Sequence, residues 1–205
     1  MASVFADFAV SLDGFIAGPN ARPGNPLGDG GTRLHEWVFV LASWREMHGL
    51  AGGDRNADDD LVRHTIERAG AHVMGRNMFD EGEVGWPESA PFHTPVFVVT
   101  HNAREPWPRP GETTFHFVTQ GAAAALEQAK SAAAGKDVRV SGGADVFQQL
   151  FGAGLIDELT LHVAPIVLGS GVRLFDRLGP GDHALEVSVA RASRLATHVT
   201  YLTSR

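Results

Sequence analysis

Two adjacent glycines, Gly142 and Gly143, stand where one regular pattern of the sequence gives way to another. Residues 138–141 alternate as in a strand, and residues 146–151 repeat apolar side chains at helical spacing. A strand, a tight turn and a helix start can hold a phosphate group, because residues without a Cβ let the ligand approach free N–H groups at the positive end of the helix. A plain connecting turn would have the same sequence, so the run by itself leaves both interpretations open.

A second strand-to-helix junction lies earlier in the chain. Residues 71–74 form an apolar run that ends at Gly75, and Arg76, Asn77 and Met78 follow where a helix can begin. The guanidinium of an arginine at a helix start offers two parallel donors that suit a phosphate. An ordinary surface ion pair is the alternative role for Arg76.

The apolar pattern alternates between strands and helices through residue 163 and then changes. Residues 185–189 and 197–201 each alternate and are close in sequence, which predicts an antiparallel hairpin. This order predicts an α/β fold with a mixed, mainly parallel sheet and helices on both faces. We expect further strands over 4–10, 71–74, 96–100, 114–119, 138–140, 159–163 and 172–175, helices over 34–47, from an Asn56 cap to a Gly70 stop, from 77, over 122–134 and over 145–151, and a proline-rich connection over 106–111.

A long loop is expected between the first strand and the first helix. Residues 18–31 are rich in proline and glycine, which rules out a regular element. Loops of this length in a compact domain often cover a ligand. We therefore regard this loop as a candidate lid.

Composition limits the classes of partner. The chain has 205 residues, 43% of them hydrophobic, and we expect a single domain over 1–205. The net charge of −7 makes nucleic acid an improbable partner, and the absence of cysteine excludes thiolate nucleophiles and Cys-bound zinc. The histidines show no metal-binding spacing. No long apolar run and no basic leader are present, so we expect a cytoplasmic protein with no membrane partner.

Four segments, 11–17, 74–79, 99–101 and 140–144, resemble the dihydrofolate reductase-like family in order and spacing. The resemblance is to the branch related to the C-terminal reductase domain of bacterial riboflavin biosynthesis. It implies a three-layer α/β/α fold whose mixed, mostly parallel sheet has about eight or nine strands and ends in an antiparallel hairpin. It also implies that NADPH binds across the strand ends.

The resemblance assigns roles to individual residues. The pyrophosphate and the nicotinamide of NADPH would lie along residues 142–146. The opposite flank of the phosphates would be formed by Gly75, Arg76, Asn77 and Met78, with Arg76 at the 2′-phosphate. Thr100, His101 and Asn102 would add donors to the adenosine phosphate, although simple turn chemistry is their alternative role. The set over 142–146 consists of Gly142, Gly143, Ala144, Asp145 and Val146, and Ile16 and Ser141 would also bind the cofactor.

Asp13 is the only carboxylate of the first familiar segment. At a strand end beside the loop over 18–31, it could orient the substrate or relay a proton, or it could cap its own backbone in an Asx turn. Proton delivery would come from Asp13 or from an ordered water. Folate reductases carry their pterin-binding carboxylate on the first helix after the lid, where this chain offers only Glu36, so dihydrofolate itself is not the expected substrate.

The resemblance thus implies an NADPH-dependent reductase. Hydride would pass to a C=N or C=O bond of a small planar, pterin- or pyrimidine-like molecule. The alternatives are the riboflavin-pathway reduction of a ribosylaminopyrimidine phosphate and a non-catalytic NADPH-binding protein. By analogy with relatives we expect a homodimer.

Overall fold

The computed structural model describes residues 2–179 and 183–203. Its helical elements are η1 Gly31–His35, α1 Glu36–Phe39, α2 Ala42–Met47, α3 Ala57–Arg68, α4 Arg76–Glu83, α5 Ala122–Ala132 and α6 Ala144–Gly152. Its strands are β1 Val4–Ser11, β2 Phe15–Ala17, β3 Ala69–Gly75, β4 Val96–Val99, β5 Trp107–Pro108, β6 Thr114–Val118, β7 Asp137–Gly142, β8 Glu158–Ala164, β9 Val172–Arg173, β10 Leu185–Ala192 and β11 Thr197–Thr203.

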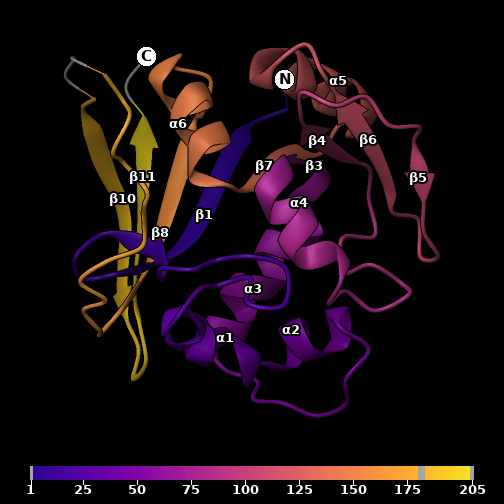
Figure 1. Ribbon diagram of the computed structural model, residues 1–205. Coiled ribbons are helices and arrows are strands. Elements are labelled where there is room, and N and C mark those ends of the chain that lie inside the picture. Colours follow the sequence, from indigo (N-terminus) through magenta and orange to yellow (C-terminus); the bar gives the residue numbers. More distant parts are fainter. Residues whose placement is uncertain (1, 180–182, 204–205) are drawn as a thin grey trace.

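Nine strands form one sheet in the order β10-β11-β8-β1-β7-β3-β4-β6-β5 (Figure 1). The neighbours from β8 to β6 are all parallel, whereas β11 runs antiparallel to β8 and β10 runs antiparallel to β11. The predicted mixed, mainly parallel sheet with a terminal hairpin is therefore confirmed. β2 and β9 form a separate two-stranded pair.

The two faces of the sheet differ in chemistry. Because successive side chains of a strand point to opposite faces, Ala6 and Phe8 of β1 lie on one face and Asp7 on the other. Ala6 and Phe8 belong to the largest core cluster, together with buried residues of α5 and α6. On the other face, Arg68 of α3 pairs with acids of β7 and β8. In Figure 1, α5 and α6 lie in the upper part of the view and α1, α2 and α3 gather below.

The single helix expected over 34–47 is wrong. The segment is divided into η1, α1 and α2, and the break falls at Leu41, whose backbone is extended. Leu41 forms a bridge with Asp54, and Asp54 accepts a hydrogen bond from the N–H of Ala42. The apolar spacing continues across the break because α1 and α2 both bury residues. The contact with Asp54 that breaks the helix comes from a distant segment, so the local sequence does not indicate it.

The end of α3 also differs from the expectation. Asn56 caps the helix as predicted, since its side chain accepts from the N–H groups of Asp58 and Asp59. Gly70, however, is not a helix stop but the second residue of β3. A Cβ at Gly70 would lie 2.2 Å from the carbonyl oxygen of Ala133, so glycine is needed there for close approach of two backbones. The proline-rich connection contains the short strand β5.

Candidate functional site

A cavity of about 960 Å³ opens where β3, β4 and β7 end. Such a volume suits a large cofactor or a cofactor and a substrate together. The residues predicted to bind a cofactor come from four separate segments, and all of them line this one cavity: Ile16; Gly75, Arg76, Asn77 and Met78; Thr100, His101 and Asn102; Ser141, Gly142, Gly143, Ala144, Asp145 and Val146.

The turn between β7 and α6 requires glycine at both positions. Gly142 has a φ of 153° and Gly143 a φ of 57°, and a Cβ at Gly142 would lie 2.5 Å from the sulfur of Met78. Gly143 is the N-cap of α6 and Gly75 is the N-cap of α4, and neither helix start has a side-chain cap. A Cβ at Gly143 would lie 3.6 Å from the Cα of Gly75. Two helix starts with free N–H groups therefore converge at the cavity, which favours an anion there.

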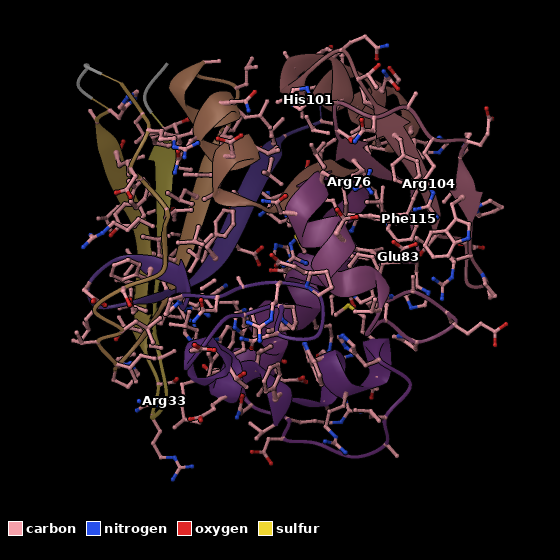
Figure 2. The ribbon with its side chains drawn as sticks, in the orientation of Figure 1. Arg33, Arg76, Glu83, His101, Arg104 and Phe115 are labelled. Carbon is pink, nitrogen blue, oxygen red and sulfur yellow. The ribbon has the colours of Figure 1, made fainter. Side chains whose placement is uncertain are left out.

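Arg76 stands at the first position of α4 and borders the cavity (Figure 2). Its Nε donates to Oδ1 of Asp80 at 2.6 Å, so the ion pair considered as its alternative role is present. Among the described residues the terminal nitrogens of its guanidinium have no hydrogen bond. The geometry of Arg76 is therefore compatible with both the ion pair to Asp80 and a contact to a 2′-phosphate.

The turn after β4 combines both of the roles expected for it. The hydroxyl of Thr100 accepts a hydrogen bond from the N–H of Asn102 at 3.1 Å, which is the turn chemistry considered as an alternative. Thr100, the exposed His101 and Asn102 all border the cavity.

Asp13 is not among the residues that line the cavity. Its carboxylate accepts from the hydroxyl of Ser11 at 2.6 Å and from the N–H groups of Leu168 at 3.1 Å and Gly169 at 2.7 Å. The hydrogen bond from Ser11, followed by those from the two N–H groups, lowers the pKa of Asp13 to about 2. The two N–H groups belong to a distant turn and not to the backbone next to Asp13, so these contacts differ from the Asx turn considered as its alternative role, and the catalytic role stays a prediction.

A polar group that the sequence analysis did not assign to the site lines the cavity from the middle of three neighbouring strands. Asp7 of β1 accepts from Nε of Arg139 on β7 at 2.7 Å, and its other oxygen lies 3.7 Å from Nε2 of His162 on β8. Burial by itself would raise the pKa of Asp7, but Arg139 and His162 outweigh it and hold that pKa well below the usual range. The one local signal was an acid inside an otherwise apolar strand.

Aromatic rings cover this polar group. The ring of Trp37 lies 4.6 Å from that of His162 and 4.8 Å from that of His198. His35 also borders the cavity, and burial, followed by the charge of His162, lowers its pKa to about 4. The Nδ1 of His35 and the indole nitrogen of Trp37 are buried without a partner among the described residues. They leave two polar atoms free beside the cavity.

The proline- and glycine-rich loop borders the same cavity through Ala21, Pro26 and Leu27. It is held by its own hydrogen bonds, such as those from the N–H of Gly18 to Leu27 and from the N–H of Asp29 to Pro19. The candidate lid is thus a cavity wall in this structure.

Neither a metal site nor a membrane-spanning helix is found in residues 2–179 and 183–203. No group of three or more histidine, aspartate or glutamate side chains there could hold a metal ion. No helix in that part of the chain is long and apolar enough to cross a bilayer.

The sheet order, with a cavity at the strand ends, defines a dihydrofolate reductase-like fold. The dihydrofolate reductase of Enterococcus faecalis matches with a TM-score of 0.52 and 16% identity, over 99% of this chain and 97% of that chain. The chain belongs to the RibD C-terminal domain family, whose family model matches residues 2–201. The resemblance stated from the sequence is therefore confirmed.

Other solved structures share the fold. A structure named as a riboflavin biosynthesis protein of Shewanella sp. PV-4 has a TM-score of 0.68 and 23% identity, with 99% of both chains covered. The diaminohydroxyphosphoribosylaminopyrimidine deaminase/5-amino-6-(5-phosphoribosylamino)uracil reductase of Thermotoga maritima has a TM-score of 0.61 and 14% identity. This chain spans 57% of that protein. No curated protein sequence matches the chain.

Proposed function

We propose that this protein is an NADPH-dependent reductase that transfers hydride to a C=N or C=O bond of a small planar substrate. The observation that carries the proposal is the convergence of two uncapped helix starts, at Gly75 and Gly143, on one side of a cavity whose other end is polar and aromatic. Membership in the RibD C-terminal domain family and the fold shared with named reductases support it.

The residues present fit the cofactor. A dinucleotide carries a pyrophosphate, and the free N–H groups of α4 and α6 are suited to that anion. Glycine at 142 and 143 keeps the space open in which the phosphates would lie. The Enterococcus faecalis relative is described as a complex with NADP(H). When bound, the cofactor supplies the hydride, and the protein's part is to orient both partners and exclude water.

The far end of the cavity suits a flat, polar substrate. Trp37 and Trp44 supply aromatic surface there. Arg139 and His35 supply polar atoms, since only Nε of Arg139 is hydrogen-bonded among the described residues and Nδ1 of His35 is unpaired. These groups fit a heterocycle with ring carbonyl or ring nitrogen acceptors.

Parallel titrations of the cofactor-free protein with NADPH and NADH, followed by tryptophan fluorescence, test the cofactor. Trp37 and Trp44 line the cavity, so quenching on binding is expected. Saturable binding that prefers NADPH supports the proposal. Failure of both cofactors to bind at millimolar concentration contradicts it.

Arg76→Ala tests the 2′-phosphate contact. A lost charge-assisted contact is worth about 1.5 to 3 kcal/mol, so we expect NADPH to bind about ten- to a hundredfold more weakly and NADH almost unchanged. Arg104→Ala is the matched control, because Arg104 is similarly exposed and also ion-paired, with Glu83, but does not line the cavity (Figure 2). Equal losses for both cofactors contradict this role for Arg76.

Family membership favours a second substrate within the same reaction class. The Thermotoga maritima relative is named as a reductase of a phosphoribosylamino-uracil, and Arg173 and Arg177 border the cavity in this chain. A turnover panel of pterins, cyclic imines and a ribosylaminopyrimidine phosphate separates these substrates. Tight NADPH binding without turnover on any of them would favour the non-catalytic alternative.

We also propose that the protein acts as a cytoplasmic homodimer. Support for the dimer comes from β10, an edge strand that exposes Val187 and Val189. Light scattering of the purified protein measures its mass. A monomer at all concentrations contradicts the dimer.

A further inference from the structure

Two histidines and two acids form a continuous row from the cavity to the start of α3. His162 and His198 are register partners on β8 and β11, and their Nδ1 atoms lie 2.8 Å apart. Nε2 of His162 lies 3.7 Å from Asp7. Nε2 of His198 lies 3.4 Å from Oδ1 of Asp58, which belongs to the first turn of α3. The histidine side chains are only 5% and 3% exposed, so the row is shielded from water.

The number of protons on the two rings decides how many of these contacts are favourable. The short contact between the two Nδ1 atoms needs one proton. If both rings are neutral, one of the two Nε2 atoms has no proton and presents a lone pair to a carboxylate. If His162 carries two protons, it donates toward Asp7 and His198, and neutral His198 keeps its Nε2 proton for Asp58. Each Nε2 atom then carries a proton beside a carboxylate, at 3.7 Å for His162 and 3.4 Å for His198, although Nε2 of His198 has no hydrogen-bond partner among the described residues.

The surroundings of the row disfavour a charge on the other two imidazoles, His198 and His35. Burial, followed by the charge of His162, lowers the pKa of His198 to about 4, although Asp58 opposes this, so His198 stays neutral. His35, which faces His162 from η1, is also neutral at pH 7 because burial lowers its pKa.

The remaining charged neighbours come from β7 and β10. Arg139 of β7 satisfies one oxygen of Asp7 and leaves the other oxygen to His162. Arg191 of β10 acts on His198 and further disfavours a charge there. The packed ring of Trp37 excludes water from both imidazoles.

We propose that His162 is the proton donor of the reductase and that His198 and Asp58 are positioning residues that keep it charged. This inference rests on the proposed function. The substrate carbon receives the hydride with its two electrons, the π pair of the C=N or C=O bond moves to the heteroatom, and that atom takes the proton from Nε2 of His162. His162 is left neutral with its proton on Nδ1, and it regains the second proton from water when the product leaves.

The charge state is tested first in the cofactor-free protein. Nitrogen-15 NMR of the imidazoles at pH 7.5 reports the protons on each ring nitrogen. We expect both nitrogens of His162 and only Nε2 of His198 to carry protons. A neutral His162 overturns the inference without bearing on NADPH binding.

The positioning role is tested by Asp58→Asn. Loss of the carboxylate removes the partner of the Nε2 proton on His198, so charged His162 becomes less stable. We expect the pH profile of kcat in Asp58→Asn to differ from that of the wild type. Asp60→Asn is the matched control, because Asp60 is an exposed acid in the same helical turn. A pH profile that is the same in both variants contradicts the role of Asp58.

The donor role is tested by His162→Gln. A general acid contributes about a hundredfold or more, so we expect a loss of that size in single-turnover hydride transfer, with NADPH binding unchanged. His64→Gln, at an exposed position of α3, is the control for replacing a histidine by glutamine. His162→Gln with normal transfer overturns the inference and leaves the reductase proposal standing, whereas wild-type protein that does not bind NADPH overturns the reductase proposal instead.

Discussion

Two carboxylates near the cavity show how surroundings decide the role of a residue. Asp7 faces a guanidinium and an imidazole at the cavity wall, whereas the oxygens of Asp13 are occupied by Ser11 and two backbone N–H groups. Both have a lowered pKa, so both carboxylates favour the charged form near pH 7. Asp7 and its neighbours Arg139 and His162 line the cavity, whereas Asp13 does not.

Asp13→Ala is expected to lower the midpoint of urea unfolding, because the N–H groups of Leu168 and Gly169 lose their acceptor. Asp13→Asn keeps one acceptor oxygen and should lose less. Urea titrations and single-turnover transfer are measured on both variants. If Asp13→Asn unfolds like the wild type but no longer transfers hydride, the catalytic role predicted from the sequence is supported over the capping role.

At the scale of elements, the site is an effect of two strand–turn–helix units placed side by side. β3 leads into α4 through Gly75, and β7 leads into α6 through Gly142 and Gly143. Because β3 and β7 are parallel neighbours, both helix starts lie at the same edge of the sheet. One such turn is common, but two facing each other make a positive cradle.

Gly143→Ala is expected to fill that cradle. The new methyl would point toward Gly75, and the positive φ would cost about 1 to 2 kcal/mol of stability. Gly135→Ala is the matched control, since Gly135 also has a positive φ but has open space around it outside the cavity. We expect similar losses of stability by urea unfolding, with NADPH binding weakened about tenfold or more only by Gly143→Ala. Equal NADPH affinities would contradict the cradle.

At the scale of the whole molecule, both faces of the sheet carry apolar clusters, but only one of them also buries histidines. The face that packs against α5 and α6 carries the largest core cluster. The opposite face carries buried histidines, one of which, His72, contacts the hydroxyl of Ser141 at 2.7 Å. Burial, followed by the charge of Arg139, lowers the pKa of His72 to about 3. The fold therefore buries His72 as a neutral imidazole on this face.

Acid should destabilise the protein through His72. In the unfolded chain His72 takes up its proton near pH 6.5, but in the folded protein only near pH 3, so the unfolded state binds more protons between these values. The free energy of unfolding should fall below pH 6.5 by about 1.4 kcal/mol per pH unit for this residue, and stay unaffected above it. Urea unfolding at several pH values measures this, and His72→Gln should fall less steeply than His64→Gln. Identical slopes would be inconsistent with a buried neutral His72.

The sequence by itself determined the features that depend on neighbouring residues. Local propensity and side-chain periodicity predict four features: the alternating strands, the Asn56 cap, the terminal hairpin and the glycine turn at 142–143. The segments of the predicted cofactor set were identified through the family resemblance, and their glycines mark positions where the backbone needs a positive φ or close approach. The break at Leu41 was missed because a contact with Asp54 causes it.

Which distant residues share the site depends on how the strands are arranged in the folded chain. Periodicity shows that Asp7, Arg139 and His162 each lie on one face of a strand, but it does not say which strands are neighbours. Parallel pairing of β1 with β7 and β8 brings these three side chains together. The pairing of β8 with β11 then adds His198 to the row. The order of the strands in the sheet is set by packing of the whole chain, because the same alternation of apolar and polar side chains is compatible with several strand orders.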